Sequence, residues 1–429
     1  MSRAAQLRQL TTPKIYDILI IGGGATGAGA ALDAAARGYQ VACIERGDFA
    51  SETSSRSTKL IWAGIKYMGT AVAAVLSPKC TIVIENADTL MEKQHHLCQW
   101  LPIAIPFDRW HVSPPPFHHA LYGFFPVLAP FVLKFYDALS WFQCPPSYIL
   151  TKSRIPEVFP QLDASKFKYC AVFYEAKHND ARTNLAIAMT AAQKEADIVN
   201  YVEMIETITE EGSDKVVGVV ALDRMTGTKF EILANKIVFC GGPFTDDLRQ
   251  METKDKIMEK RAVRGAHGTH IVLPGYYCPP NMGLLDFNTS DRRFLFLLPW
   301  EGHTLVGTTD AKGDAETLPR PPEQEVDWIL KESSKYMKID YRRQDVTSAW
   351  RGWRPLAVDP HAPPGAPVSR DHVISENPST GIIFIAGGKW TTWREMAEEV
   401  VDRALGKERP CTTLDITLFG GEGCESLYC

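Results

Sequence analysis

The sequence lacks the cysteine and histidine patterns of a metal centre. Its ten cysteines include no C-x-x-C pair, and none of them stands near histidines at the spacing of a zinc site. A chain of 429 residues is long enough to bury a sizeable core without disulfide bonds. We therefore expect that the protein binds no metal, that its thiols are reduced and that it works in an interior compartment of the cell.

The sequence also lacks a block of basic residues, an internal repeat and a low-complexity tract. Its net charge is -5, with lysine and arginine scattered along the chain, which disfavours a nucleic-acid partner. The charged fraction of 23% and the hydrophobic fraction of 45% are those of an ordinary globular protein. An anionic substrate would need a local cationic pocket, because the net charge of the protein does not attract it.

A long uninterrupted apolar run is missing as well. Residues 120–142 are apolar and aromatic, but two prolines, Lys134 and Asp137 interrupt them. A spanning helix needs about 20 apolar residues, so a buried helix pair is favoured here, with a patch that docks on a bilayer as the alternative. Residues 1–14 lack the apolar core of a secretory signal and are too short to identify as a transit peptide.

Near the N-terminus the pattern predicts one βαβ unit. Residues 15–21 are almost continuously apolar and β-branched, which indicates a buried strand that stops at glycine. The alanine-rich stretch 25–38 then predicts a helix ending at Gly38, and residues 39–46 predict the second strand. Together they have the length of a βαβ unit.

Later segments extend this α/β pattern and add an antiparallel one. We expect a helix over 181–196, a buried strand over 236–242, antiparallel strands over 269–274, 293–299 and 303–310, and a strand, Gly-Gly turn and amphipathic helix over 381–405. This order predicts a nucleotide-binding domain assembled from separated segments, with a second domain built on an antiparallel sheet. The predicted boundaries are 15–76, 171–246 and 351–405 for the cofactor domain, 77–170 and 247–350 for the substrate domain, and 406–429 for a tail.

The turn between the first strand and helix carries a G-x-G-x-x-G fingerprint. Gly22 permits the tight turn, Gly24 lets the backbone approach a pyrophosphate, and Gly27 lets helix and strand pack closely. Glu45 ends the second strand, 18 residues beyond Gly27, where it can accept both ribose hydroxyls and would repel a 2′-phosphate. This context makes the motif a strong signal for a dinucleotide, but it does not choose between NAD and FAD.

Three further motifs each have a functional and a structural interpretation. In residues 386–395, two glycines precede Lys389, and a following threonine can cap a helix that points at a polar ligand or is merely a capped helix. His270 is a candidate base, although a lone histidine is more often a core residue. Residues 351–356 either contribute an arginine to the site or form an arginine-stabilised turn before Pro355.

Taken together, these strings resemble the FAD-dependent glycerol-3-phosphate dehydrogenases, and the mitochondrial, eukaryotic branch most of all. The resemblance runs from Ile15 to Leu405 in the family's order. The strings that carry it are "YDILIIGGGATGAGAALDAAARG", "TSSRSTKLI", "HNDARTNLAIAMTAA", "GTHIVLPGYY", "MGLLD", "VGTTD", "RPL" and "IAGGKWTTWREMAE".

The resemblance implies non-covalent FAD and the oxidation of sn-glycerol 3-phosphate to dihydroxyacetone phosphate. Electrons would then pass from the reduced flavin to ubiquinone, at the peripheral surface of the mitochondrial inner membrane. Whether the protein forms a homodimer stays an open question at this point. The family's C-terminal helical domain is expected to be absent, since the chain stops at Cys429.

By the same resemblance, individual residues acquire expected roles. His270 would take the proton of the reacting alcohol and Arg354 would orient it. The substrate phosphate would be held by Lys66, Tyr67, Lys389, Thr391 and Thr392. The FAD would be lined by Gly22, Gly24, Gly27, Glu45, Thr53, Ser54, Ser57, Lys59, Leu60, Gly242, Pro243, Asp310, Gly388 and Lys389.

The chain departs from the family's pattern in several places. Trp62 replaces a histidine, Ala63 a glycine and Lys66 an arginine; "CGGP" at 240–243 replaces "ATGP", and "RGWRPL" at 351–356 replaces "SGVRPL". Two alternatives therefore stand beside the leading hypothesis. One is a related flavoprotein that oxidises another small hydroxy acid or amine. The other is a catalytically weakened or silent flavin-binding paralogue.

Overall fold

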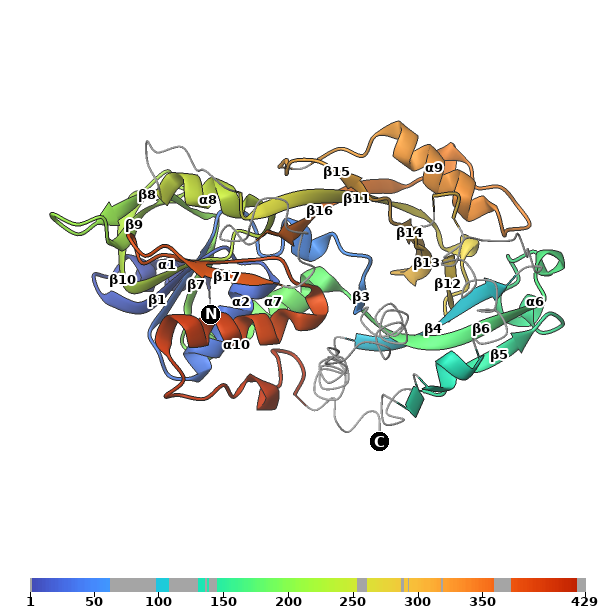
Figure 1. Cartoon of the computed structure of the whole chain (residues 1–429), viewed down its shortest axis with the longest axis horizontal. Helices are drawn as coiled ribbons and strands as arrows, with labels where there is room; N and C mark the ends of the chain where they lie inside the picture. Colours follow the sequence, from blue (N-terminus) through green and yellow to red (C-terminus); the bar gives the residue numbers. More distant parts are fainter. Residues whose placement is uncertain are drawn as a thin grey trace, which may run out of the picture.

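Two β-sheets, each with its own helices, form the two ends of an elongated molecule (Figure 1). The computed structural model describes residues 2–61, 98–107, 130–135, 137–138, 145–252, 261–286, 289–291, 293–317, 319–358 and 372–422. Trp62, Ala63, Lys66 and Tyr67 lie outside the described residues, as does most of the apolar segment 120–142.

The first sheet is the expected nucleotide-binding sheet. Within the described residues, its main path runs β17 (Val373–Glu376), β18 (Ile383–Ala386), β10 (Lys229–Phe239), β1 (Ile15–Ile21), β2 (Val41–Glu45) and β7 (Asp197–Asn200). The four pairs that join β18, β10, β1, β2 and β7 are parallel, while β17 runs antiparallel at the edge. A hairpin of β8 (Val202–Thr209) and β9 (Val216–Asp223) attaches through β10.

Three helices cover one face of this sheet (Figure 1). They are α2 (Ala25–Ala36), α7 (Asp180–Gln193) and α10 (Trp393–Leu405). Small residues in α2 allow close packing, because a Cβ on Gly29 would lie 2.8 Å from the buried ring of Trp393. The other face packs against α1 (Arg3–Thr11) and α8 (Thr245–Glu252).

The second sheet carries long antiparallel strands. Its main path is β15 (Ala311–Lys312), β11 (Val263–Pro274), β14 (His303–Gly307), β13 (Leu295–Trp300), β12 (Gly283–Asp286), β4 (Cys98–Phe107), β6 (Tyr169–His178) and β3 (Leu60–Ile61). Among the described strands of this second sheet, only β4 and β12 pair in parallel. β16 (Ser348–Ala357) pairs with β11, and β5 (Tyr148–Thr151) pairs with β6.

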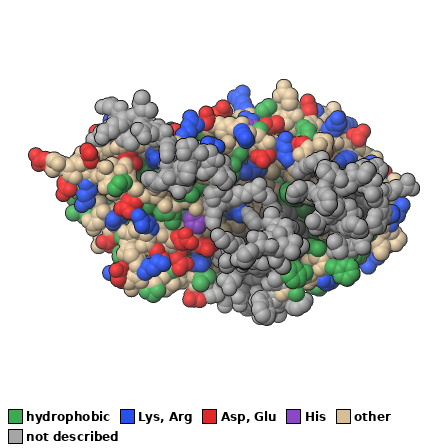
Figure 2. Space-filling model, viewed as in Figure 1, with side chains coloured by type: hydrophobic (Ala, Val, Ile, Leu, Met, Phe, Trp, Pro, Cys, Tyr) green, Lys and Arg blue, Asp and Glu red, His purple; other side chains and the backbone are tan. Residues whose placement is uncertain are grey.

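Short helical elements complete the described chain. Helices α6 (Ile155–Val158) and α9 (Glu323–Ser334) pack against the second sheet through a shared apolar core. The 3-10 turns are η1 (Thr53–Ser55), η2 (Ala164–Lys166), η3 (Gly242–Phe244), η4 (Gly275–Tyr277), η5 (Arg343–Asp345), η6 (Trp390–Thr392) and η7 (Thr413–Asp415). Among the described residues, no helix has both the length and the hydropathy needed to cross a membrane. Basic and acidic side chains are interspersed over the face in Figure 2.

The α/β class predicted from the sequence is confirmed, with two local corrections. The turn interpretation of residues 351–356 is wrong, because they lie within β16, which pairs along β11 over ten residue pairs. The helix expected over 181–196 is α7, which begins at Asp180 and ends at Gln193, before Glu195 enters the left-handed region at φ 71°. The predicted domain boundaries stay predictions.

A buried ion cluster ties α2 to α10. The side chain of Arg37 is fully enclosed, 2.6 Å from Asp33 on its own helix and 2.6 Å from Asp402 near the end of α10. Burial raises the pKa of Asp33 even though the guanidinium of Arg37 opposes that shift. The Asp33 carboxylate therefore depends on Arg37 to remain charged at low cost.

We predict that Arg37→Met lowers the free energy of unfolding by about 3–5 kcal/mol, because it leaves the Asp33 carboxylate buried without its partner. The control is Arg343→Ala, which breaks the exposed pair with Glu323 and is expected to change the free energy of unfolding far less, because water screens an exposed pair. Urea unfolding followed by circular dichroism measures both. Equal losses in the two variants would contradict the role given to the cluster.

Candidate cofactor and substrate site

Two glycines of the fingerprint are required by packing. Gly22 has φ +112°, and a Cβ there would lie 2.4 Å from the carbonyl oxygen of Cys240. A Cβ on Gly27 would lie 1.8 Å from the carbonyl oxygen of Gly22. The turn between β1 and α2 therefore closes onto β10 only with glycine at both positions.

Gly24 is different, because the fold leaves space beside it. It is the N-cap residue of α2 with φ -72°, and among the described residues its added Cβ would meet Ser54 Oγ alone, at 3.0 Å. Ser54 Oγ also accepts a hydrogen bond from Ala25 N at 2.9 Å. The start of α2 thus presents open backbone where a helix N-terminus favours an anion.

Glu45 stands at the end of β2, as expected, and organises the turn as well. Its carboxylate accepts hydrogen bonds from Gly23 N at 2.7 Å and from Gly47 N at 2.8 Å. Burial raises the pKa of Glu45, and these two backbone donors oppose the shift. Each carboxylate oxygen can accept a further bond, so the interaction with a ribose hydroxyl stays available.

A pocket opens over this turn at the carboxyl ends of β1 and β2. It is bounded on one side by β8 and α8. Arg46, which follows β2, and Phe244 of η3 also line it, and the guanidinium lies 4.2 Å from the ring centre. This pocket is where a ligand of an open parallel sheet is expected. The predicted cofactor residues that line it are Gly22, Gly24, Glu45, Thr53, Ser54, Gly242 and Pro243.

His270 and Arg354 lie on one face of the second sheet. In the register of β11 with β16, His270 is paired with Trp350 and Ala266 with Arg354, and directly paired residues share a face. The pair between them, Gly268 with Gly352, carries no side chains. The two residues that the resemblance assigned as catalytic therefore lie on the same face of the ladder, separated by one pair of glycines.

The imidazole of His270 is enclosed. Its ring stacks on Trp350 with centres 5.5 Å apart, and Nε2 lies 3.1 Å from Thr58 Oγ1. Nδ1 is buried and has no hydrogen-bond partner among the described residues. Burial, with smaller contributions from Arg354 and Lys59, lowers the pKa of His270 to about 3, so the ring is neutral at physiological pH.

Arg354 is held by the residues that follow β14. Its Nη1 donates to Asp310 Oδ1 at 2.9 Å, and its Nη2 donates to Thr308 Oγ1 at 3.3 Å and to the carbonyl oxygen of Thr309 at 3.4 Å. A Cβ on Gly268 would lie 2.8 Å from Nη2, so glycine there makes room for the guanidinium. Asp310, which the resemblance assigned to the cofactor, thus lies beside Arg354.

The segment 53–60 connects the two sheets. Thr53 Oγ1 donates to the carbonyl oxygen of Trp353 at 2.6 Å, and Leu60 begins β3 in the second sheet. Ser57 Oγ and Lys59 Nζ both donate to Asp180, at 2.7 and 2.6 Å. Their predicted contact with FAD remains a prediction, because in this structure those side-chain atoms are engaged by Asp180.

The glycine turn before α10 also approaches the site. Gly388 has φ +78°, and a Cβ there would lie 2.2 Å from Met396 Sδ. Thr392 is the N-cap residue of α10, but its side chain bonds the backbone of Lys389 and closes η6 instead of capping α10. Thr391 is buried, and Trp390 Nε1 donates to the carbonyl oxygen of Ser54 at 3.1 Å. The roles of Lys389 and both threonines toward a phosphate stay predictions.

The sequence did not point to several residues that shape the site. Asp180 holds the segment 53–60, Thr58 contacts His270, and Asn184 Nδ2 donates to the carbonyl oxygen of Gly23 at 2.9 Å. Asp180 and Asn184 lie in the "HNDARTNL" string, whose polar residues at the start of an apolar helix were a usable signal. Among the described residues, no cluster of three or more histidine, cysteine or acidic side chains could hold a metal.

We predict that Gly24→Val abolishes FAD binding and leaves the fold intact, because the side chain would occupy the open space above α2. Gly27→Val is the matched comparison and should fail to fold, since its side chain would collide with the carbonyl of Gly22. Flavin absorbance per protein and circular dichroism separate the two outcomes. Full flavin content in folded Gly24→Val would show that the cofactor lies elsewhere.

Comparisons with known proteins show the family of the chain. A sequence profile described as FAD dependent oxidoreductase matches residues 17–399. The chain is 42% identical to mitochondrial glycerol-3-phosphate dehydrogenase of Mus musculus, covering 98% of this chain and 58% of that protein. It is 39% identical to the mitochondrial enzyme of Schizosaccharomyces pombe, covering 100% of this chain and 68% of that protein.

A solved structure shares the fold over almost the whole chain. The glycerol-3-phosphate dehydrogenase of Bacillus halodurans, complexed with FAD, superposes with a TM-score of 0.74 at 30% identity, covering 98% of this chain and 71% of that one. The present chain spans 58% of the length of the mouse relative. The open helix N-terminus at Gly24, the acidic Glu45 and the adjoining pocket fit the dinucleotide. The chain belongs to the FAD-dependent oxidoreductase family and, within it, to the glycerol-3-phosphate dehydrogenases, with FAD as its cofactor.

Proposed function

We propose that this chain oxidises sn-glycerol 3-phosphate to dihydroxyacetone phosphate. The observation that carries the proposal is the placement of His270 and Arg354 on one face of the second sheet, next to the segment 53–60 that also contacts the nucleotide turn. The names of the relatives, which are glycerol-3-phosphate dehydrogenases, support the substrate.

The bound flavin supplies the hydride acceptor of this chemistry. Arg354 orients the alcohol oxygen of the substrate and stabilises negative charge as it develops there. Its ion pair with Asp310 and its bonds to Thr308 and Thr309 hold the guanidinium in one place, so little reorganisation is needed during the reaction.

His270 accepts the proton of the same alcohol. A pKa of about 3 keeps the imidazole unprotonated before the substrate binds, and burial is the main cause of this low value. The neutral ring is therefore able to accept a proton when the alcohol binds.

We also infer the surroundings of the reaction from the family. Lys389, Thr391 and Thr392 hold the phosphate, together with Lys66 and Tyr67 outside the described residues. Electrons leave to ubiquinone at a membrane surface, and the protein works in the mitochondrion, peripheral to the inner membrane. The names of the mitochondrial relatives support this location.

Anaerobic reduction of the flavin tests the proposed substrate. The purified, FAD-loaded chain is mixed with glycerol 3-phosphate, glycerol or glycine, and the flavin absorbance is followed. We expect bleaching with glycerol 3-phosphate at low concentration and little with the other two. Bleaching by glycine alone would favour an amine oxidase, and no bleaching by any of them would favour a silent paralogue.

We predict that Arg354→Ala slows flavin reduction at saturating glycerol 3-phosphate by about 10²-fold, as expected when one electrostatic stabiliser is removed. The control is Arg351→Gln on the same strand. Arg351 faces the opposite side, where it contacts His267 and Glu325, so its loss should lower stability and leave the rate close to that of the wild type. Stopped-flow absorbance measures the rates, and equal rates in wild type and Arg354→Ala would rule out this role.

A further inference from the structure

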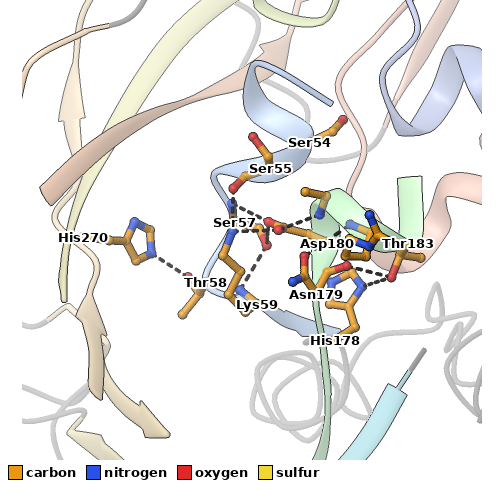
Figure 3. A network of polar contacts seen from close by, with 12 residues as sticks. Ser54, Ser55, Ser57, Thr58, Lys59, His178, Asn179, Asp180, Thr183 and His270 are labelled. Carbon is orange, nitrogen blue, oxygen red and sulfur yellow. Dashed lines mark hydrogen bonds and ion pairs between the residues drawn. The ribbon is translucent and has the colours of Figure 1, made fainter. Parts of the chain in front are cut away.

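A single buried carboxylate organises the segment beside His270. Asp180, the first residue of α7, is fully buried and accepts three bonds from this segment: from Ser57 N at 3.1 Å, Ser57 Oγ at 2.7 Å and Lys59 Nζ at 2.6 Å. Lys59 Nζ also donates to the carbonyl oxygen of Ser55 at 2.5 Å. Figure 3 shows these bonds converging on Asp180.

The conformation held by Asp180 is one that the segment would not adopt freely. Lys59 has φ +64°, in the left-handed region that is unfavourable for a non-glycine residue. Its ammonium group is also buried, which lowers the pKa of Lys59, while the charge of Asp180 opposes that shift. Both the backbone strain and the buried charge are therefore balanced by contacts with the same carboxylate.

Thr58, which lies between Ser57 and Lys59, points away from Asp180. Ser57 and Lys59 face Asp180, while Thr58 extends toward β11, where Oγ1 lies 3.1 Å from His270 Nε2 (Figure 3). The opposite edge of the segment is also fixed, since the backbone N–H of His178 donates to the carbonyl oxygen of Lys59 at 3.0 Å. The position of the Thr58 hydroxyl is thus set by Asp180.

The residues packed around the imidazole of His270 restrict its orientation and therefore its hydrogen-bond partners. Trp350 covers one ring face, and the Cδ2 edge lies against Gly307, where an added Cβ would come within 2.4 Å of it. Nδ1 of His270 and Nε1 of Trp350 are buried and have no hydrogen-bond partner among the described residues. Buried polar atoms of this kind are normally satisfied, so these two atoms point to a bound molecule that completes them.

We propose that Asp180 and Thr58 are positioning residues for His270: Asp180 fixes the segment 55–59, and Thr58 accepts a hydrogen bond from Nε2–H, which leaves Nδ1 as the nitrogen that receives the substrate proton. This inference rests on the proposed function for the identity of the proton donor. The orientation of the ring follows from the contacts of the protein alone, whereas the tautomer is the part that we infer.

The chain offers a matched control in a second buried histidine–threonine pair. His178 Nδ1 lies 3.1 Å from Thr183 Oγ1, and both residues are buried in the same region (Figure 3). Thr183→Val removes a hydrogen bond of the same type and length without touching His270. Thr58→Val removes the hydroxyl beside His270, and Thr58→Ser retains it.

The first measurement is steady-state turnover of glycerol 3-phosphate with an artificial electron acceptor. Thr58→Val should lower kcat by about tenfold, the upper range for one neutral hydrogen bond, with KM nearly unchanged. Thr58→Ser should restore kcat, and Thr183→Val should leave it near the wild-type value. If Thr58→Val and Thr183→Val lowered kcat equally, the effect would be structural and the proposal would be wrong.

The second measurement does not depend on activity. The protein loaded with FAD is labelled with ¹⁵N-histidine, and the His270 signals are assigned by their loss in His270→Gln. We expect wild type to show the Nε2–H tautomer, and Thr58→Val and Asp180→Asn to show a mixture of tautomers at unchanged flavin content. An unchanged His270 tautomer in both variants would overturn the inference, whereas failure of glycerol 3-phosphate to reduce wild type would overturn only the proposed function.

Discussion

Ser54 Oγ accepts a hydrogen bond from Ala25 N at the start of α2, while the preceding Thr53 donates to the carbonyl oxygen of Trp353 in β16. These two bonds join the nucleotide sheet to the second sheet through adjacent residues. The segment can approach β16 this closely because a Cβ on Gly352 would lie 2.9 Å from Arg56. The position of His270 and Arg354 relative to the cofactor turn depends on this junction, since those residues belong to one sheet and the fingerprint belongs to the other.

The two faces of the β11–β16 ladder have different tasks. One face carries His270, Trp350 and Arg354 with glycines between them, and the other carries His267 and Arg351. On that second face, Arg351 Nη2 lies 2.5 Å from His267 Nε2 and 3.2 Å from Glu325 Oε1. The strand is therefore supported from behind by an ionic cluster, and the site face is left free of competing charges from these groups.

Two of the departures from the family's pattern lie within the described residues, and the structure shows where their side chains are. In "RGWRPL", Arg351 and Trp353 both point to the supporting face, where Trp353 packs edge-on against His267 and its Nε1 donates to the carbonyl oxygen of Glu316. In "CGGP", Cys240 is buried under the turn at Gly22. The departures in "RGWRPL" therefore lie behind the face that carries His270 and Arg354, whereas Cys240 and Gly241 of "CGGP" line the pocket over the cofactor turn.

Local patterns in the sequence were sufficient for the first βαβ unit. The apolar run 15–21, the alanine-rich stretch after it and the spacing to Glu45 are local features, so periodicity and spacing predicted β1, α2 and β2 correctly, while the role of the turn in binding the cofactor stays a prediction. The resemblance to a family supplied His270 and Arg354.

The tertiary structure alone decided which face of a strand each side chain occupies and what lies opposite it. His267 and His270 are three residues apart, so the alternation of side chains along a strand puts them on opposite faces, but only the pairing of β11 with β16 and β14 decides which of the two lies beside Arg354. Two long-range contacts connect Asp180 to His270. The ion pair between Lys59 and Asp180 joins residues that are 121 positions apart, and the contact between Thr58 and His270 joins residues that are 212 positions apart. No local pattern encodes such contacts, because they form only when the two sheets are assembled around the segment 53–60.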